Sequence, residues 1–506
     1  MNSQITDNDI YLGYEISEVN FERFHNALAD PWEITNFVNI YSGHRHIISI
    51  GPNGSGKSRK LLIPNLYRLK KWSTLVIDPK GELAVLTAKQ RNDSGSEIVT
   101  FDPFGVIESR YPGLVKELPY LKSRGFNPLA MLDPEKDDFH DDAKALSEAL
   151  IKDEGPDTHW VSSAQSLITG LIMALRMTLG ADDSEGSLVG LRELLSMKPD
   201  NLSKCISDLI NGTLSEPVVS AKLNRFLAIN PDSKELLSIL STAVTQTDWI
   251  DSKPIRREIS SGTFDFSEMK RRPITVYLIL PPRYLETHAI WLRMMITAVL
   301  TPLIRSTAAG VPVMLMLDEF AALGHLEVIE RNMALMRGYG IKLWVVLQDL
   351  SQLKSCYEKR WESFIANAGL IQSFAPQDMM TRRYLSQLSG QQLISVKSSS
   401  NASGSTSNYY NWSESKNSTS SVNISRVLEN VYPEDELAQM SETHSVLFEA
   451  QRAPRRTLLP DPSELLLFQT SENLSLAAAY AAQHEVDELN DKEQLCAKQN
   501  MPDSEI

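Results

Sequence analysis

Residues 46 to 58 read His46-Ile-Ile-Ser-Ile-Gly-Pro-Asn-Gly-Ser-Gly-Lys-Ser58. The apolar run before Gly51 has the composition of a buried strand, and the segment that follows is a complete P-loop motif. In such a loop the backbone N–H groups surround the phosphates, the lysine reaches the β and γ oxygens, and the next hydroxyl ligates Mg²⁺. The sequence therefore predicts a site for ATP with Mg²⁺. The residues expected to bind the nucleotide are Gly51, Pro52, Asn53, Gly54, Ser55, Gly56, Lys57 and Ser58.

A second apolar run ends in two carboxylates, as a Walker B strand does. Val313-Met-Leu-Met-Leu317 is followed by Asp318 and Glu319. Five consecutive apolar residues are typical of a parallel strand that is covered on both faces. We expect Asp318 to hold the Mg²⁺ ion together with Ser58, and Glu319 to act as the base on an attacking water. The pair favours hydrolysis of ATP over simple storage of the nucleotide.

Strand-like runs alternate with helical patterns over much of the chain. They lie at residues 74–78, 97–101, 274–280, 313–317, 343–347 and 370–374, with a later run at 445–448. This rhythm is typical of an α/β nucleotide-binding core. Between residues 135 and 260 the strand patterns stop, and apolar residues from Ala164 to Leu175 follow helical spacing. The predicted fold class is therefore α/β with an inserted all-α domain.

Composition narrows the classes of protein that the chain can represent. Its 506 residues leave room for two or three domains. Cys205, Cys356 and Cys496 lie far apart, and the nine histidines form no cluster, so we expect a reducing compartment and no structural metal. The net charge of −14 argues against a surface that coats DNA or anionic lipid nonspecifically.

Membrane and export signals are not expected in this sequence. The first nine residues are polar and acidic, unlike a signal peptide. The most apolar stretch, residues 289–304, is interrupted by Arg293 and is shorter than the roughly 18 apolar residues of a membrane span. We therefore expect a cytoplasmic protein with no transmembrane segment of its own.

Two polar segments leave alternatives open. Residues 398–423 are dominated by Ser, Asn and Thr and are expected to form a long mobile loop. The alternative is that Tyr409, Tyr410 and Trp412 lie in a central pore and stack on the bases of single-stranded nucleic acid. Residues 461–506 are expected to be an acidic tail, which is either simply solvated or docks a basic partner.

Several further motifs occur in a fixed order along the chain. They are Asp78-Pro-Lys-Gly-Glu82, Phe126-Asn-Pro-Leu129, Leu315-Met-Leu-Asp-Glu-Phe-Ala-Ala-Leu-Gly-His325, Met336-Arg-Gly-Tyr-Gly340 and Leu347-Gln-Asp-Leu-Ser-Gln-Leu353. Over about residues 46 to 458 this series closely resembles the type IV coupling proteins of conjugation and secretion systems. The resemblance implies a RecA-like P-loop motor core. We expect this core at 46–134 and 261–460, the all-α domain at 135–260 and an N-terminal extension at 1–45.

The resemblance also implies roles for individual residues. Lys57 and Ser58 would contact nucleotide and metal, Asp318 would bind Mg²⁺, and Glu319 would be the catalytic base. Arg337 matches the family's arginine finger, which reaches the γ-phosphate of a neighbouring subunit. Gln348 resembles the residue that senses phosphate and relays its loss. Such fingers act between subunits, so the implied assembly is a ring, expected to be a hexamer.

The implied function is that of a coupling ATPase, which recruits a relaxase with its single-stranded DNA, or a protein, to an inner-membrane type IV secretion channel. Many relatives begin with two transmembrane helices, whereas this chain starts almost directly at the motor. Recruitment to the inner membrane by another protein is therefore expected. Two alternatives remain: a docking platform of the same system that is not a motor, and a pilus-assembly P-loop ATPase.

Overall fold

A large mixed sheet forms the centre of the molecule. The computed structural model describes residues 8–15, 38–151, 158–179, 183–212, 217–230, 233–306, 310–407 and 414–460. Eleven strands lie in the order β2-β1-β13-β12-β9-β3-β8-β7-β4-β6-β5. The strands from β9 to β5 run parallel, and the four at the other edge pair antiparallel. Their bounds are β1 Ile10–Glu15, β2 Val38–Tyr41, β3 His46–Ile50, β4 Ser73–Ile77, β5 Glu97–Phe101, β6 Ile274–Leu278, β7 Val313–Leu317, β8 Ile341–Leu347, β9 Ala368–Ser373, β12 His444–Glu449 and β13 Arg455–Leu458.

The parallel strands are apolar along their whole length because helices cover both faces of the sheet. Alternate residues of one strand enter two different cores: Leu315 and Leu317 of β7 belong to one, and Met314 and Met316 to the other. The first core is closed by helix α14 and the all-α domain, and the second by helices α3 and α4. Every strand run expected from the sequence is confirmed as a strand, since burial on both faces leaves a continuous apolar pattern.

The helices around the core follow the strands in the alternating order expected of an α/β fold. They are α3 Ile63–Arg68, α4 Glu82–Asp93, α5 Val106–Arg110, α6 Leu114–Glu117, α14 Leu285–Arg305, α15 Glu327–Met336, α16 Leu350–Tyr357, α17 Trp361–Asn367, α18 Met379–Leu388 and α19 Glu434–Ala438. A π-helical turn, Ser58–Leu62, joins the P-loop to α3.

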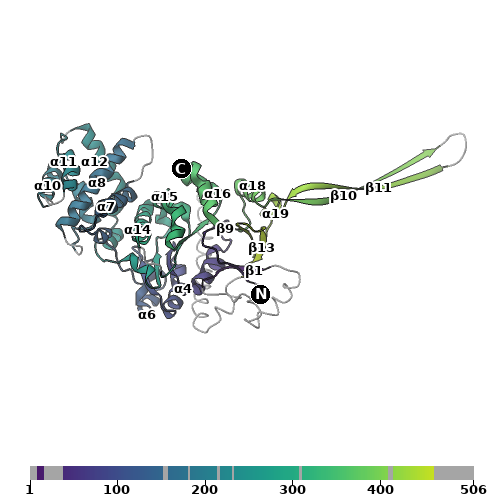
Figure 1. The fold of residues 1–506 in the computed structure, drawn as a ribbon, viewed down its shortest axis with the longest axis horizontal. Coiled ribbons are helices and arrows are strands. Elements are labelled where there is room, and N and C mark those ends of the chain that lie inside the picture. Colours follow the sequence, from purple (N-terminus) through teal and green to yellow (C-terminus); the bar gives the residue numbers. More distant parts are fainter. Residues whose placement is uncertain are drawn as a thin grey trace, which may run out of the picture.

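The segment between residues 135 and 260 contains only helices among its described elements, as a fold class with an inserted all-α domain predicts. Its helices are α7 Phe139–Leu150, α8 Thr158–Thr178, α9 Leu188–Leu195, α10 Pro199–Gly212, α11 Pro217–Leu227, α12 Lys234–Gln246 and α13 Lys253–Ile259. Helix α8 contacts α7, α9, α10, α11 and α12 and is therefore the centre of this domain. The domain lies at one end of the molecule (Figure 1).

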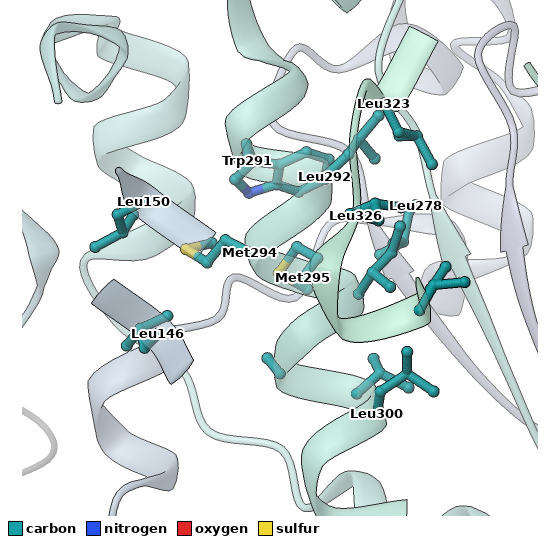
Figure 2. Close-up of a cluster of buried hydrophobic side chains, with 14 of the residues drawn as sticks. Leu146, Leu150, Leu278, Trp291, Leu292, Met294, Met295, Leu300, Leu323 and Leu326 are labelled. Carbon is teal, nitrogen blue, oxygen red and sulfur yellow. The ribbon is translucent and has the colours of Figure 1, made fainter. Parts of the chain in front are cut away.

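Helix α14 joins the inserted domain to the sheet. The stretch Pro282–Arg305 is the one described helix long and apolar enough to cross a membrane, but 72% of its most apolar window is buried inside the protein. Figure 2 shows its side chains packed between the all-α domain and the core. The labelled residues are Leu146 and Leu150 of α7, Leu278 of β6, Trp291, Leu292, Met294, Met295 and Leu300 of α14, and Leu323 and Leu326. This burial favours a core helix.

The chain enters the inserted domain and leaves it through two segments that lie side by side, at residues 125–127 and 258–262. The backbone N–H of Phe126 donates to the carbonyl of Glu258 at 2.7 Å, and that of Asn127 donates to Gly262 at 2.9 Å. A Cβ atom on Gly262 would lie 2.4 Å from the carbonyl oxygen of Gly125, so this crossing requires glycine. The Glu258 side chain is also buried here and accepts a hydrogen bond of 2.6 Å from Ser123 Oγ.

Glu258 should make the stability of the protein depend on pH. Burial raises its pKa from 4.5 to about 7, although the Ser123 hydrogen bond opposes the shift. Because the folded pKa is the higher one, this contribution to stability is complete below pH 4.5 and is lost as the pH rises through 7. In Glu258→Gln it disappears, so the free energy of unfolding of this variant relative to wild type should rise by up to about 3 kcal/mol between pH 4.5 and 8.

Thermal or urea unfolding of the two chains across that pH range measures this difference. Glu235→Gln, a change of an exposed acid on α12, is the matched control and should give a constant difference. A constant difference for Glu258→Gln as well would contradict the prediction.

Two parts of the fold differ from the expectation. The extension expected at 1–45 supplies strands β1 and β2 to the central sheet, where β1 pairs with β13. Sequence patterns did not show this because the two paired strands lie more than 400 residues apart. The mobile loop expected at 398–423 is wrong: β10 Gln391–Ser407 and β11 Glu414–Asn430 form an antiparallel hairpin. Over residues 399–407 and 414–421 the backbone pairing continues without an apolar alternation in the sequence.

The remaining expectations for these polar segments are not addressed by the fold. Tyr409, Tyr410 and Trp412 lie outside the described residues, as does the tail at 461–506.

Candidate nucleotide site

The P-loop follows β3, which lies between β8 and β9 in the parallel part of the sheet. Gly54 and Gly56 have φ angles of 79° and 81°, the left-handed region that favours glycine. A Cβ atom on Gly51 would approach Cβ of Phe374 to 2.7 Å, so close packing requires glycine there too. The glycines of the motif therefore have local structural reasons as well as a place in phosphate binding.

Lys57 turns back onto its own loop. Its ammonium donates to the carbonyl oxygens of Gly51 at 2.5 Å and Pro52 at 2.9 Å. Burial lowers the pKa of Lys57, while the carboxylates of Asp318 and Glu319 oppose this shift. A cation thus stands beside the loop, close to both acids that the sequence assigned to the site.

Ser58 and Asp318 meet although 260 residues separate them. Ser58 Oγ donates to Asp318 Oδ2 at 2.6 Å. Asp318 directly follows β7, and only β8 lies between β7 and β3, so the carboxyl ends of these parallel strands meet at one edge of the sheet. Burial raises the pKa of Asp318, and the hydrogen bond from Ser58 opposes the rise. The two groups predicted to bind one metal ion are thus in direct contact.

Glu319 has an unusual backbone and a side-chain partner from the next strand. Its φ and ψ of 56° and 41° lie in the left-handed region, which costs a non-glycine residue about 1–3 kcal/mol. Gln348 Nε2, just after β8, donates to Glu319 Oε2 at 3.3 Å. The Gln348 N–H in turn donates to Gln352 Oε1 at 3.1 Å. The structure therefore brings Glu319 and Gln348 together beside Ser58 and Asp318.

Arg337 does not join this group within one chain. It is exposed and begins a short 3₁₀ turn, Arg337–Tyr339, that precedes β8, whereas Gln348 follows the same strand. The seven residues of β8 span more than about 20 Å at 3.3 Å per residue. The arginine thus lies at the amino ends of the parallel strands, whereas the P-loop lies at their carboxyl ends.

Sequence reasoning missed a repeated turn beside the site. Asp78-Pro-Lys-Gly81 follows β4, and Asp102-Pro-Phe-Gly105 follows β5. The Asp78 carboxylate accepts from the N–H of Ala84 at 2.8 Å, and that of Asp102 accepts from Val106 and Ile107 at 2.9 Å. Each aspartate thereby satisfies the first N–H groups of the next helix. The recurrence of Asp-Pro-x-Gly after two strands was the signal available in the sequence.

Asp78 also adds a buried acid next to Asp318. Burial raises its pKa to about 7, the N–H of Ala84 opposes the rise, and the carboxylates of Glu82 and Asp318 add to it. Among the parallel strands β4 is the direct neighbour of β7. The site therefore contains a further buried acid, Asp78, beyond Asp318 and Glu319, which the sequence predicted.

Comparison with known proteins identifies relatives along most of the chain. A conjugal transfer protein TraG of Escherichia coli is 26% identical over 392 residues, which are 72% of this chain and 58% of that protein. A VirD4 protein of Rhizobium radiobacter is 26% identical over 366 residues, 70% of this chain and 49% of that protein. The chain thus spans about half the length of these curated relatives.

A solved structure shows the same fold. The plasmid coupling protein TrwB in complex with the non-hydrolysable GTP analogue GDPNP is 16% identical, with a TM-score of 0.59 over 89% of this chain and 94% of that one. The likeness confirms the predicted fold, an α/β core with an inserted all-α domain. The family model for type IV secretory system conjugative DNA transfer matches residues 15–458. This chain therefore belongs to the family of type IV secretion proteins for conjugative DNA transfer.

Proposed function

We propose that this chain is the coupling ATPase of a type IV secretion system. It binds ATP with Mg²⁺, hydrolyses ATP, and uses the energy to move a relaxase with its single-stranded DNA, or a protein, into an inner-membrane channel. The observation that supports this most strongly is the 2.6 Å contact between Ser58 and Asp318, which joins the two halves of a P-loop site. Family membership supplies the biological setting.

The residues at the site fit a magnesium nucleotide. Ser58 and Asp318 offer two oxygen atoms 2.6 Å apart, close to the roughly 2.9 Å edge of an octahedral Mg²⁺ shell. Gly54 and Gly56, with their positive φ, allow the loop N–H groups to turn towards phosphate oxygens. TrwB has been solved with ADP and Mg²⁺. When bound, Mg²⁺ would neutralise charge on the β and γ phosphates.

Each nearby side chain then has a distinct role in the proposal. Lys57 exchanges its bonds to Gly51 and Pro52 for bonds to phosphate, which keeps the buried ammonium satisfied. Glu319 orients the attacking water and accepts its proton. Gln348 holds the Glu319 carboxylate and lies where it can respond to loss of the γ-phosphate. The strained backbone of Glu319 fixes the direction of its side chain.

In this proposal, Arg337 indicates how the subunits assemble. It is exposed and forms no ion pair with any residue that the structure describes, so its guanidinium is available to another chain. Placed against the nucleotide of a neighbouring copy, it would neutralise charge that develops in the transition state. We propose a ring, a hexamer, with each site completed by the next subunit. In this proposal the ring acts at the inner membrane.

Measuring ATP turnover of the purified chain with and without single-stranded DNA tests the function. We expect DNA to increase turnover, and the stimulation to fall steeply as salt rises from about 50 to 200 mM because phosphate contacts release counterions. A Lys57→Ala preparation controls for contaminating ATPases. If single-stranded DNA does not change ATP turnover at any salt concentration, the docking platform is favoured over the motor. The family match favours coupling over pilus assembly.

A further inference from the structure

The β10–β11 hairpin projects from the body opposite the all-α domain (Figure 1). All 17 residues of each strand are paired, from Gln391 with Asn430 to Ser407 with Glu414. At about 3.3 Å per residue the ribbon is about 55 Å long. Its base is fixed, because Val431 N–H donates to the Gly390 carbonyl at 2.9 Å and Asn430 Nδ2 donates to Ser386 Oγ at 2.9 Å. The hairpin is therefore a defined arm.

Near its base the arm exposes a row of large apolar side chains. Leu393 lies opposite Leu428, and Ile424 and Val422 lie on the same face beyond Arg426, because residues two apart share a face. The exposed fractions of the four apolar side chains are 66% for Leu393, 61% for Leu428, 58% for Ile424 and 66% for Val422. A two-stranded ribbon alone is only marginally stable in water. Covering this face, which we call the Leu393 face, would stabilise the arm.

The outer edge of β10 is open to a further strand. Within the described residues β10 and β11 pair only with each other, so each keeps one edge without a neighbour. Proteins protect such edges with proline, bulges or charges. Neither strand contains proline, the pairing runs without a bulge, and β10 carries a single charge, Lys397. This edge has little that would stop another strand from pairing with it.

The charges of the arm indicate which partner suits it. The arm carries three positive charges, on Lys397, Lys416 and Arg426, and two negative charges, on Glu414 and Glu429. Its net charge is therefore 3 − 2 = +1. This near-neutral ribbon offers little attraction to a polyanion, and a net charge of +1 repels a second ribbon of the same kind only weakly. If β11 of another copy adds to β10, the antiparallel alternation continues. The same register then aligns the apolar residues of the two arms on one face.

We propose that the β10–β11 hairpin is a self-association element, in which the outer edge of β10 pairs with β11 of a second copy of this chain and the two Leu393 faces become continuous. Backbone hydrogen bonds supply the attachment, and the apolar cross-strand pairs set the register. The contact involves no residue of the nucleotide site. If the contact is not found, the proposed ATPase still stands. If the chain has no ATPase activity, the proposed contact still stands.

The mass of the full chain in solution, measured by light scattering over a series of concentrations, tests the proposal. The double variant Leu393→Lys/Leu428→Lys should need about tenfold more protein, or more, to associate to the same degree. Leu237→Lys changes a similarly exposed leucine of the all-α domain, 47% exposed, and should associate like wild type. A monomeric wild type, or equal association of wild type and the double variant, would overturn the proposal.

Cross-linking locates the contact. In chains whose three native cysteines are replaced by serine, Val396→Cys and Ser425→Cys are introduced separately, and the two chains are mixed. In the hairpin register these positions lie directly opposite each other on one face, so a disulfide between the two chains should form. Ser395→Cys lies on the other face, and its mixture with Ser425→Cys should give far less product. Equal yields in both mixtures, or none in either, would overturn the proposal.

Discussion

Glu319→Gln lowers ATP turnover by about a thousandfold while MgATP binding stays near that of the unmodified chain; this is the expected result for a general base, whose removal costs 10²–10⁴. Glutamine keeps the size of the side chain and can still accept the bond from Gln348, which now measures 3.3 Å. It cannot accept a proton from water. Phosphate release measures turnover, and displacement of a fluorescent nucleotide measures binding.

Two control variants separate chemistry from binding and from backbone strain. Lys57→Ala removes the charge that faces the phosphates, so it should weaken nucleotide binding as well as turnover. Glu358→Gln changes the other described glutamate with a positive φ, 44°, which is exposed on a turn after α16, and it should keep normal turnover. Turnover of Glu319→Gln within about tenfold of wild type would remove the residue from the role of base.

The core of the site could be predicted because its signals are local in the sequence. The P-loop is one continuous motif, and the run before Asp318 is apolar throughout because both faces of β7 are buried. The two segments must meet, since parallel strands of one sheet present their carboxyl ends at the same edge. The contact of Ser58 with Asp318 agrees with this expectation.

The features that escaped prediction depend on long-range pairing or on backbone conformation. Strand β1 is recognisable only beside β13, which lies at the far end of the chain. The left-handed backbone of Glu319 has no signature, because glutamate gives no hint of a positive φ. Away from their base, the hairpin strands are rich in Ser and Asn and lack the alternation by which strands are recognised. In each case the deciding interaction is absent from any local window of sequence.

Substitution of Arg337 is the second change expected to lower ATP turnover strongly, and it should act between subunits. Because β8 separates Arg337 from Gln348 in one chain, the arginine can act only on a neighbour's nucleotide. Arg337→Ala should therefore reduce turnover by about 10³-fold or more, as loss of an arginine finger does. Arg331→Ala, which removes an exposed arginine of α15 that pairs with Glu327, should keep normal turnover.

Mixing the two inactive chains, Arg337→Ala and Glu319→Gln, should restore activity, because a site with the base from the first chain and the finger from the second is complete. With equal amounts and random order around a ring of head-to-tail contacts, about one quarter of the sites are complete, so turnover should recover to about a quarter of wild type. Subunits must exchange before the measurement, which a dilution and reconcentration step allows. Mixtures no more active than the separate variants would show that Arg337 does not complete the site of a neighbour, and the ring would then need another cation at that position.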